Sequence, residues 1–132
     1  MIGGMDRTMA SKILIVDDEP SLTVPLQFLM ERHGFEVMVV HNGEDALSAM
    51  DRFKPNLVIL DIMLPAIDGF QVCQNLRENP RQKHVKVVFL SALTRDLDIA
   101  KGNTLGADAY ITKPFSNADV VRLVNELLSG CD

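Results

Sequence analysis

The sequence predicts an α/β domain in which a parallel sheet of five strands is covered by helices on both faces. Short runs rich in β-branched apolar residues alternate with longer segments of helical period, which is typical of repeated βα units. Three of these runs are apolar almost throughout, as expected of strands buried on both faces. The length of 132 residues suffices for one domain with a continuous core and is too short for two ordinary domains.

Each expected element follows from its local pattern. The strands are predicted at the apolar runs Lys12–Val16, Phe35–Val40, Asn56–Leu60, Lys86–Leu90 and Asp108–Ile111. The helices, each with an apolar stripe, are predicted at Pro20–His33, Gly43–Phe53, Gly69–Glu78, Thr94–Leu105 and Asn117–Ser129. Gly34 and Gly106 stand where helices should end, and Ser116 or Asn117 can cap the last helix. Pro25 interrupts the first helical pattern, so a kink or a late helix start is expected.

The amino-acid composition and the distribution of charge argue against several classes of function. Apolar residues make up 47% and charged residues 23%, as in ordinary globular domains. The formal charge of -5, without a run of Lys or Arg, disfavours direct binding to nucleic acid or to an anionic membrane. The apolar runs are too short to span a bilayer and the first residues lack the apolar stretch of a signal peptide, so a cytoplasmic location is predicted. Met1 to Ala10 is interpreted as a disordered lead-in to a domain at residues 11–130, and Cys73 and Cys131 show no metal-ligand spacing.

Polar side chains stand directly after four of the predicted strands: Asp17, Asp18 and Glu19, then Asp61, Ser91 and Lys113. A doubly wound sheet binds its ligand beyond the carboxyl ends of its strands, so these side chains should gather there. Clustered carboxylates repel one another, and a hard divalent cation such as Mg²⁺ would relieve that repulsion. A lysine and a hydroxyl opposite would hold an anion on the metal, which is the arrangement that phosphoryl transfer needs. Asp61 is then the expected covalent acceptor, and the lack of GxxxxGK and GxGxxG argues against a nucleotide as direct donor.

Four separated strings, ILIVDDEP, LVILDIMLPAIDGF, VVFLSAL and GADAYITKPF, resemble those of bacterial response-regulator receiver domains over roughly Ser11 to Ser129. The resemblance implies a flavodoxin-like sheet of order 2-1-3-4-5 and a phosphorylation-dependent switch of two-component signalling. It implies that Asp61 is the phosphoacceptor and that Mg²⁺ is held by Asp61, by Asp18 directly, by Asp17 through water and by the backbone carbonyl of Met63.

The resemblance also assigns the remaining roles. Lys113 would pair with the phosphoryl oxygens, and Pro114 would follow a cis peptide bond. Ser91 corresponds to the switching hydroxyl and Tyr110 to the aromatic that turns inward with it. A histidine kinase or a phosphotransfer protein would donate the group, often through contact with the first helix. The output would be a changed face made by the fourth helix, fifth strand and fifth helix, acting on a downstream protein or on an output domain outside this chain. Such a domain catalyses its own phosphorylation and slow hydrolysis but is not a conventional enzyme.

Simpler explanations stay open for several residues. Asp17 and Asp18 could cap the first helix, whereas Pro65 to Gly69, including Asp68, is interpreted as a turn and helix start. Ser91 could be a polar strand end and Tyr110 ordinary packing. The histidines are expected to be surface residues: His33, His41 and His84.

Two rival functions are compatible with the same topology. One is a receiver-like interaction module that acts without phosphorylation. The other, a flavin-binding protein, is disfavoured because aromatics make up only 5% of the chain.

Met63 and Leu93 are expected to border the path of the water that hydrolyses the phosphorylated aspartate. Gly102 should lower the stability of the fourth helix by about 1 kcal/mol, which suits a mobile surface. A homodimer through the last helix stays open, since no charge pattern there specifies one.

Overall fold

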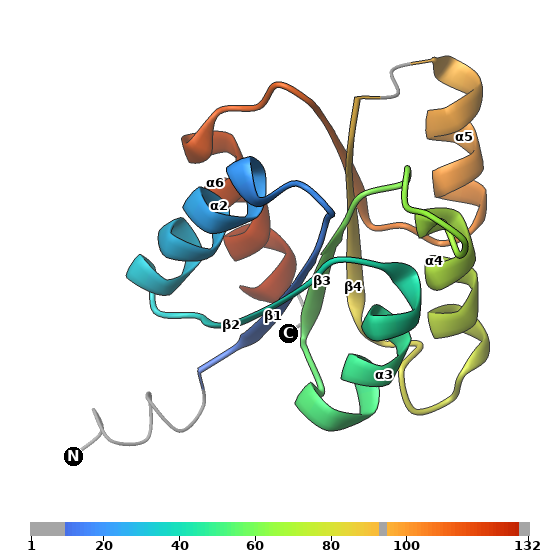
Figure 1. Cartoon of the computed structure of the whole chain (residues 1–132), viewed down its shortest axis with the longest axis horizontal. Coiled ribbons are helices and arrows are strands. Elements are labelled where there is room, and N and C mark those ends of the chain that lie inside the picture. Colours follow the sequence, from blue (N-terminus) through green and yellow to red (C-terminus); the bar gives the residue numbers. More distant parts are fainter. Residues whose placement is uncertain (1–9, 93–94, 130–132) are drawn as a thin grey trace.

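The computed structural model describes residues 10–92 and 95–129, which form five strands and five helices in strict alternation (Figure 1). The strands are β1 (Lys12–Val16), β2 (Glu36–Val40), β3 (Leu57–Leu60), β4 (Lys86–Ser91) and β5 (Ala109–Thr112). The helices are α2 (Pro20–Arg32), α3 (Gly43–Phe53), α4 (Gly69–Glu78), α5 (Asp96–Thr104) and α6 (Asn117–Ser129). Every predicted element is therefore present, with bounds that differ from the predicted ones by two residues at most.

The five strands form one parallel sheet of order β2-β1-β3-β4-β5, which confirms the predicted topology. Helices α2 and α6 cover one face, and α3, α4 and α5 lie on the other (Figure 1). Alternate residues of β3 serve the two layers, since Val58 and Leu60 belong to one apolar cluster and Leu57 and Ile59 to the other. All four are buried, as expected of a strand covered on both sides.

The register of the sheet brings the carboxyl ends of β1, β3 and β4 to one edge. Val16 pairs with Leu60, and Leu60 pairs with Phe89. The residue after β3, Asp61, donates its backbone N–H to the carbonyl of Val16 at 2.9 Å. The side chains that follow these strands therefore lie beside one another.

Side chains and glycines define the helix ends as the sequence predicts. Asp68 and Gln71 form a reciprocal capping box at the start of α4, which confirms a structural role for Asp68. The hydroxyl of Ser116 accepts the Asp119 N–H at 3.0 Å and so caps α6. Gly34 and Gly106 have φ of 91° and 93°, a left-handed conformation that glycine adopts without strain.

Of the two alternatives expected from Pro25, the late helix start is wrong, because α2 begins at Pro20 and runs through Pro25; the kink stays a prediction. Pro25 removes one backbone hydrogen bond, but Leu26 and Met30 on the same helix are buried against the sheet. Burial of an apolar face contributes more to helix stability than local propensity does, so the helix continues through the proline.

Three predictions concern residues outside the described part. The lead-in Met1 to Ala10 is described only at Ala10, and Leu93 and Cys131 are not described. Cys73 is a buried free thiol in α4. No helix among residues 10–92 and 95–129 is long and apolar enough to cross a membrane.

Candidate functional site

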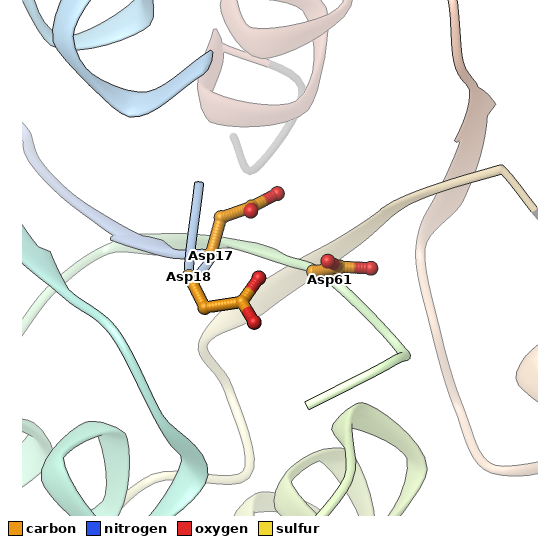
Figure 2. A group of neighbouring side chains, drawn as sticks. All are labelled: Asp17, Asp18 and Asp61. Carbon is orange, nitrogen blue, oxygen red and sulfur yellow. The ribbon is translucent and has the colours of Figure 1, made fainter. Parts of the chain in front are cut away.

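Three carboxylates meet at the carboxyl edge of the sheet (Figure 2). Asp17 and Asp18 follow β1, Asp61 follows β3, and one oxygen from each lies within 4.8 Å of the others. Asp17 and Asp61 are only 1% and 6% exposed, whereas Asp18 is exposed. The strand-end prediction of a carboxylate cluster is thus confirmed, and three hard oxygen donors at this spacing suit a divalent cation.

Lys113, just after β5, brings a positive charge to this cluster. Its Nζ lies 3.0 Å from Asp17 Oδ2 and 3.5 Å from both Asp61 Oδ2 and Glu19 Oε1. The Lys113 backbone N–H donates to the carbonyl of Ser91 at 2.9 Å, which ties the lysine to the end of β4. The bond between Lys113 and Pro114 is cis, as predicted. One ammonium group therefore faces several carboxylates, and negative charge remains for a cation to neutralise.

Burial is the main cause that raises the pKa of Asp61, and the neighbouring charge of Asp17 raises it further. Two groups lower the pKa of Asp61 without cancelling this rise: the Lys113 ammonium and the Met63 backbone N–H. The Met63 N–H donates to Asp61 Oδ1 at 3.2 Å. For Lys113, burial lowers the pKa, but the hydrogen bond to Asp17 and the charges of Asp61, Asp17 and Glu19 outweigh burial and raise the pKa overall. The ionised Asp61 carboxylate is thus undercompensated beside a lysine that stays charged.

Ser91 and Tyr110 form a second pair next to the carboxylates. Ser91 is the last residue of β4, rather than the residue after it as predicted, and it is fully buried. Burial and the charge of Asp98 raise the pKa of Tyr110, and Asp61 adds to the rise, while a hydrogen bond with the Ser91 side chain opposes it. Tyr110 is therefore close enough to Ser91 for a side-chain hydrogen bond and is affected by the charges of Asp98 and Asp61.

Gly69 has a role that sequence reasoning missed. Its N–H donates to the carbonyl of Ile62 at 2.9 Å, and a Cβ built on it would collide with the Asp61 carbonyl oxygen and approach Ile62 Cα to 2.7 Å. Only a glycine lets α4 begin this close to the end of β3. The dipeptide of Asp68 and Gly69 indicated a helix start but carried no sign of this contact.

The simpler explanations are now decided for the capping and surface residues. The N-cap of α2 is Glu19, without a side-chain cap bond, so capping by Asp17 or Asp18 is wrong. Asp17 Oδ1 instead accepts the Glu19 backbone N–H at 3.0 Å. All three histidines are exposed, as predicted, and His41 Nδ1 lies 3.0 Å from the Asp17 carbonyl oxygen.

The parallel sheet, the carboxylates and the lysine agree with the comparison with known families. A family model described as the response regulator receiver domain matches residues 13–125. The chain belongs to this family. Receiver domains are the phosphorylation-dependent switches of two-component regulators, so the predicted fold and signalling class are confirmed and the phosphorylation-independent rival is not favoured. The finer boundaries at residues 11–130 stay a prediction.

Curated proteins support the same assignment. The receiver domain is 42% identical over 120 residues to the alkaline phosphatase synthesis transcriptional regulatory protein PhoP of Bacillus subtilis, an alignment of 91% of this chain and 49% of that protein. It is 40% identical over 121 residues to the DNA-binding response regulator MtrA of Mycolicibacterium smegmatis, covering 92% of this chain and 52% of the relative. The chain thus spans about half the length of the curated relatives it matches.

Solved receiver domains share the whole architecture. The BeF3-activated DrrB receiver domain superposes with a TM-score of 0.84 at 30% identity, covering 92% of this chain and 99% of that one. The signal receiver domain of a histidine kinase from Syntrophus aciditrophicus gives a TM-score of 0.85 at 33% identity, with 92% of both chains covered.

Proposed function

We propose that this receiver domain accepts a phosphoryl group on the carboxylate of Asp61 with the help of Mg²⁺. The observation that carries the proposal is the meeting of three carboxylates within 4.8 Å of one another, with the Lys113 ammonium 3.5 Å from Asp61. Asp17, Asp18 and Asp61 would hold the ion together with the backbone carbonyl of Met63. When bound, the ion supplies positive charge for the oxygens of the entering phosphoryl group.

The protein's own residues would perform the transfer by positioning and charge. An oxygen of Asp61 attacks the phosphorus of a phosphohistidine, the P–N bond breaks, and the departing imidazole keeps the electron pair and takes up a proton. The product is an acyl phosphate on Asp61. Lys113 already lies within 3.5 Å of Asp61, so its ammonium would pair with a phosphoryl oxygen after a small movement away from Asp17. Water attack on the same phosphorus would later return the free carboxylate.

Ser91 and Tyr110 would report the modification to the surface. Ser91 shares a side-chain hydrogen bond with Tyr110 in this arrangement. A phosphoryl oxygen on Asp61 is a stronger, charged acceptor for the Ser91 hydroxyl. We expect Ser91 to exchange its partner, which frees Tyr110 to change position.

The donor is expected to be a histidine kinase or a histidine phosphotransfer protein, and α2 offers a surface for it. Val24 and Phe28, one helical turn apart, are 64% and 61% exposed, an unusual state for large apolar side chains. Beside this helix lies a hollow of about 500 Å³ whose lining includes Pro25 of α2 and Phe115 and Lys113 after β5. An apolar helix of the donor would thus approach next to Lys113 and the phosphoacceptor.

We infer the location and the output from the family and its relatives. A cytoplasmic location follows from the usual place of response regulators. Relatives described as transcriptional or DNA-binding regulators are about twice as long as this chain, so we assign the DNA contact to the part of those relatives that this chain does not match. The receiver domain itself would act through protein contacts.

Labelling with acetyl phosphate and Mg²⁺ tests the proposal. We expect wild type to gain one phosphoryl group by intact mass, in a linkage that hydroxylamine cleaves, and Asp61→Asn to gain none. Asp68→Asn is the matched control, because it removes a nearby carboxylate that caps α4 and leaves an equally good capping residue. Full labelling of Asp61→Asn would refute the assignment, and a wild type that is never labelled would favour the phosphorylation-independent module.

A further inference from the structure

Over Asp98–Thr104, the part of helix α5 whose side-chain burial is described, no apolar side chain is buried in the core. Among its described residues only Asp98 and Gly102 are buried, and neither brings an apolar side chain to the core. Burial of an apolar face is what ordinarily holds a helix in position. In this part of α5, individual contacts with neighbouring side chains therefore take the place of a buried apolar face.

Those contacts converge on three rings, which we call the aromatic row: Phe70 of α4, Phe89 of β4 and Tyr110 of β5. The rings of Phe70 and Phe89 meet edge to face, with centroids 5.4 Å apart and planes at 68°. The rings of Phe89 and Tyr110 follow at 6.0 Å and 56°. The row thus connects α4 with the tyrosine whose hydroxyl shares a hydrogen bond with Ser91.

Helix α5 contacts both ends of the aromatic row. A Cβ on Gly102 would lie 3.1 and 3.2 Å from two ring carbons of Phe89 and 3.6 Å from a ring carbon of Tyr110, so the helix backbone rests directly on these rings. One residue earlier, the Lys101 Nζ stands 4.6 Å from the centroid of Phe70, within the range of a cation–π interaction. A movement of the Tyr110 ring therefore cannot leave the position of α5 unchanged.

We propose that the contact between Lys101 and Phe70 is a positioning contact that fixes α5 on the aromatic row. By fixing α5, this contact keeps Tyr110 at Ser91 and so opposes the movement of Ser91 towards a phosphoryl group. The inference rests on the proposed phosphorylation of Asp61. An interaction made in only one of two arrangements shifts the equilibrium towards that arrangement by its own free energy. Removing the Lys101 ammonium should therefore make it easier for Ser91 to turn towards a phosphoryl group.

Tyr110 provides the readout, because the chain contains one tyrosine and no tryptophan. Intrinsic fluorescence then reports on Tyr110 alone. Beryllofluoride with Mg²⁺ serves as the probe that imitates a phosphoryl group, and its binding is followed independently by ¹⁹F NMR. We expect Lys101→Met to bind beryllofluoride about two- to fivefold more tightly than wild type, the effect of losing one exposed cation–π contact. Lys101→Arg, which keeps a cation over the ring, should restore the wild-type affinity.

The chain offers a matched control in Lys12, whose Nζ stands 5.5 Å from the ring centroid of Phe53, outside the aromatic row. Lys12→Met removes the same kind of contact and should leave the affinity for beryllofluoride unchanged. Gly102→Ala is a second test, since its methyl group would press α5 away from Phe89 and should also tighten binding.

Each outcome separates the two hypotheses. Absence of bound beryllofluoride in wild type would refute the proposed phosphorylation site itself. Binding to wild type that leaves Tyr110 fluorescence unchanged would overturn the role of the aromatic row. An affinity of Lys101→Met that equals or falls below that of wild type, or an equal gain in Lys12→Met, would overturn the role of Lys101.

Discussion

Replacement of Asp61 by asparagine should stabilise the domain in the absence of metal, although it removes the phosphoacceptor. In the fold, the Asp61 carboxylate lies beside two others and is buried, and both conditions raise its pKa. A raised pKa means that the ionised carboxylate is less favourable in the folded than in the unfolded chain. An amide at this position carries no charge and can still accept the Met63 N–H.

The size of the gain follows from the distances. With effective dielectric constants between about 20 and 80, a repulsion between unit charges at the 4.8 Å limit costs about 1–3.5 kcal/mol, and the attraction to Lys113 at 3.5 Å returns about 1–5 kcal/mol. Asp61 takes part in two such repulsions and one attraction. We therefore expect Asp61→Asn to raise the free energy of unfolding by about 0.5–2 kcal/mol.

Urea unfolding followed by far-UV circular dichroism measures this gain. In EDTA the variant should be the more stable protein, and Mg²⁺ at about ten times its Kd should stabilise wild type by about 1.4 kcal/mol and the variant by much less. Glu126→Gln, which removes an exposed carboxylate of α6, is the control. A variant that is less stable than wild type in EDTA, or that gains equally from Mg²⁺, would refute the reasoning.

The raised pKa of Asp61 fixes how the stability difference between wild type and Asp61→Asn changes with pH. The penalty from Asp61 is fully present above its raised folded pKa and vanishes below the ordinary carboxyl value of 3.8. The stability difference between wild type and Asp61→Asn in EDTA should therefore shrink as the pH is lowered from 7 towards 4. A difference that grows on acidification would show that burial of the charge is not its cause.

Three further substitutions test other parts of the structure. Arg77→Met should destabilise the domain by about 1–3 kcal/mol in urea unfolding, because Arg77 donates to three backbone carbonyls and forms a partly exposed ion pair with Asp108 at 2.9 Å. A loss below about 0.5 kcal/mol would contradict this. Gly69→Ala should lower the free energy of unfolding by about 1–3 kcal/mol, because the added methyl group collides with the Asp61 backbone. The same variant should be labelled more slowly by acetyl phosphate, and unchanged labelling would argue against a role of that contact in the site. Met63→Asn should shorten the lifetime of the acyl phosphate, because the apolar side chain of Met63, which is 62% exposed, would no longer screen the site from water. The lifetime is measured by the decay of the phosphorylated mass, and an unchanged lifetime would exclude this role.

The fold and the carboxylate cluster were predictable from the sequence because both follow from local patterns. Apolar runs and helical periods locate the strands and helices, and the parallel arrangement forces whatever follows the strands to one edge. Asp17, Asp18, Asp61 and Lys113 therefore meet as expected.

The contacts around the switch could not be predicted in this way. Phe70, Phe89 and Tyr110 lie 19 to 40 positions apart along the chain, and their packing depends on how each helix is rotated on the sheet. Nothing in the sequence pointed to Arg77, which reaches from the last turn of α4 to carbonyls of two other segments. From Pro25 alone, a kink and a late helix start could not be told apart; the burial of Leu26 and Met30, which excludes the late start, depends on the packing of α2 on the sheet.

The close approach that Gly69 permits also bears on how a donor protein must behave. With the helix start pressed against the backbone of Asp61, the main chain that carries this carboxylate has little room to move outwards. The donor's imidazole must then travel to the aspartate and align itself there. Discrimination between correct and incorrect donors would then depend on how well the donor's surface fits the surface around Asp61. A small error in that fit would lower the rate of phosphoryl transfer.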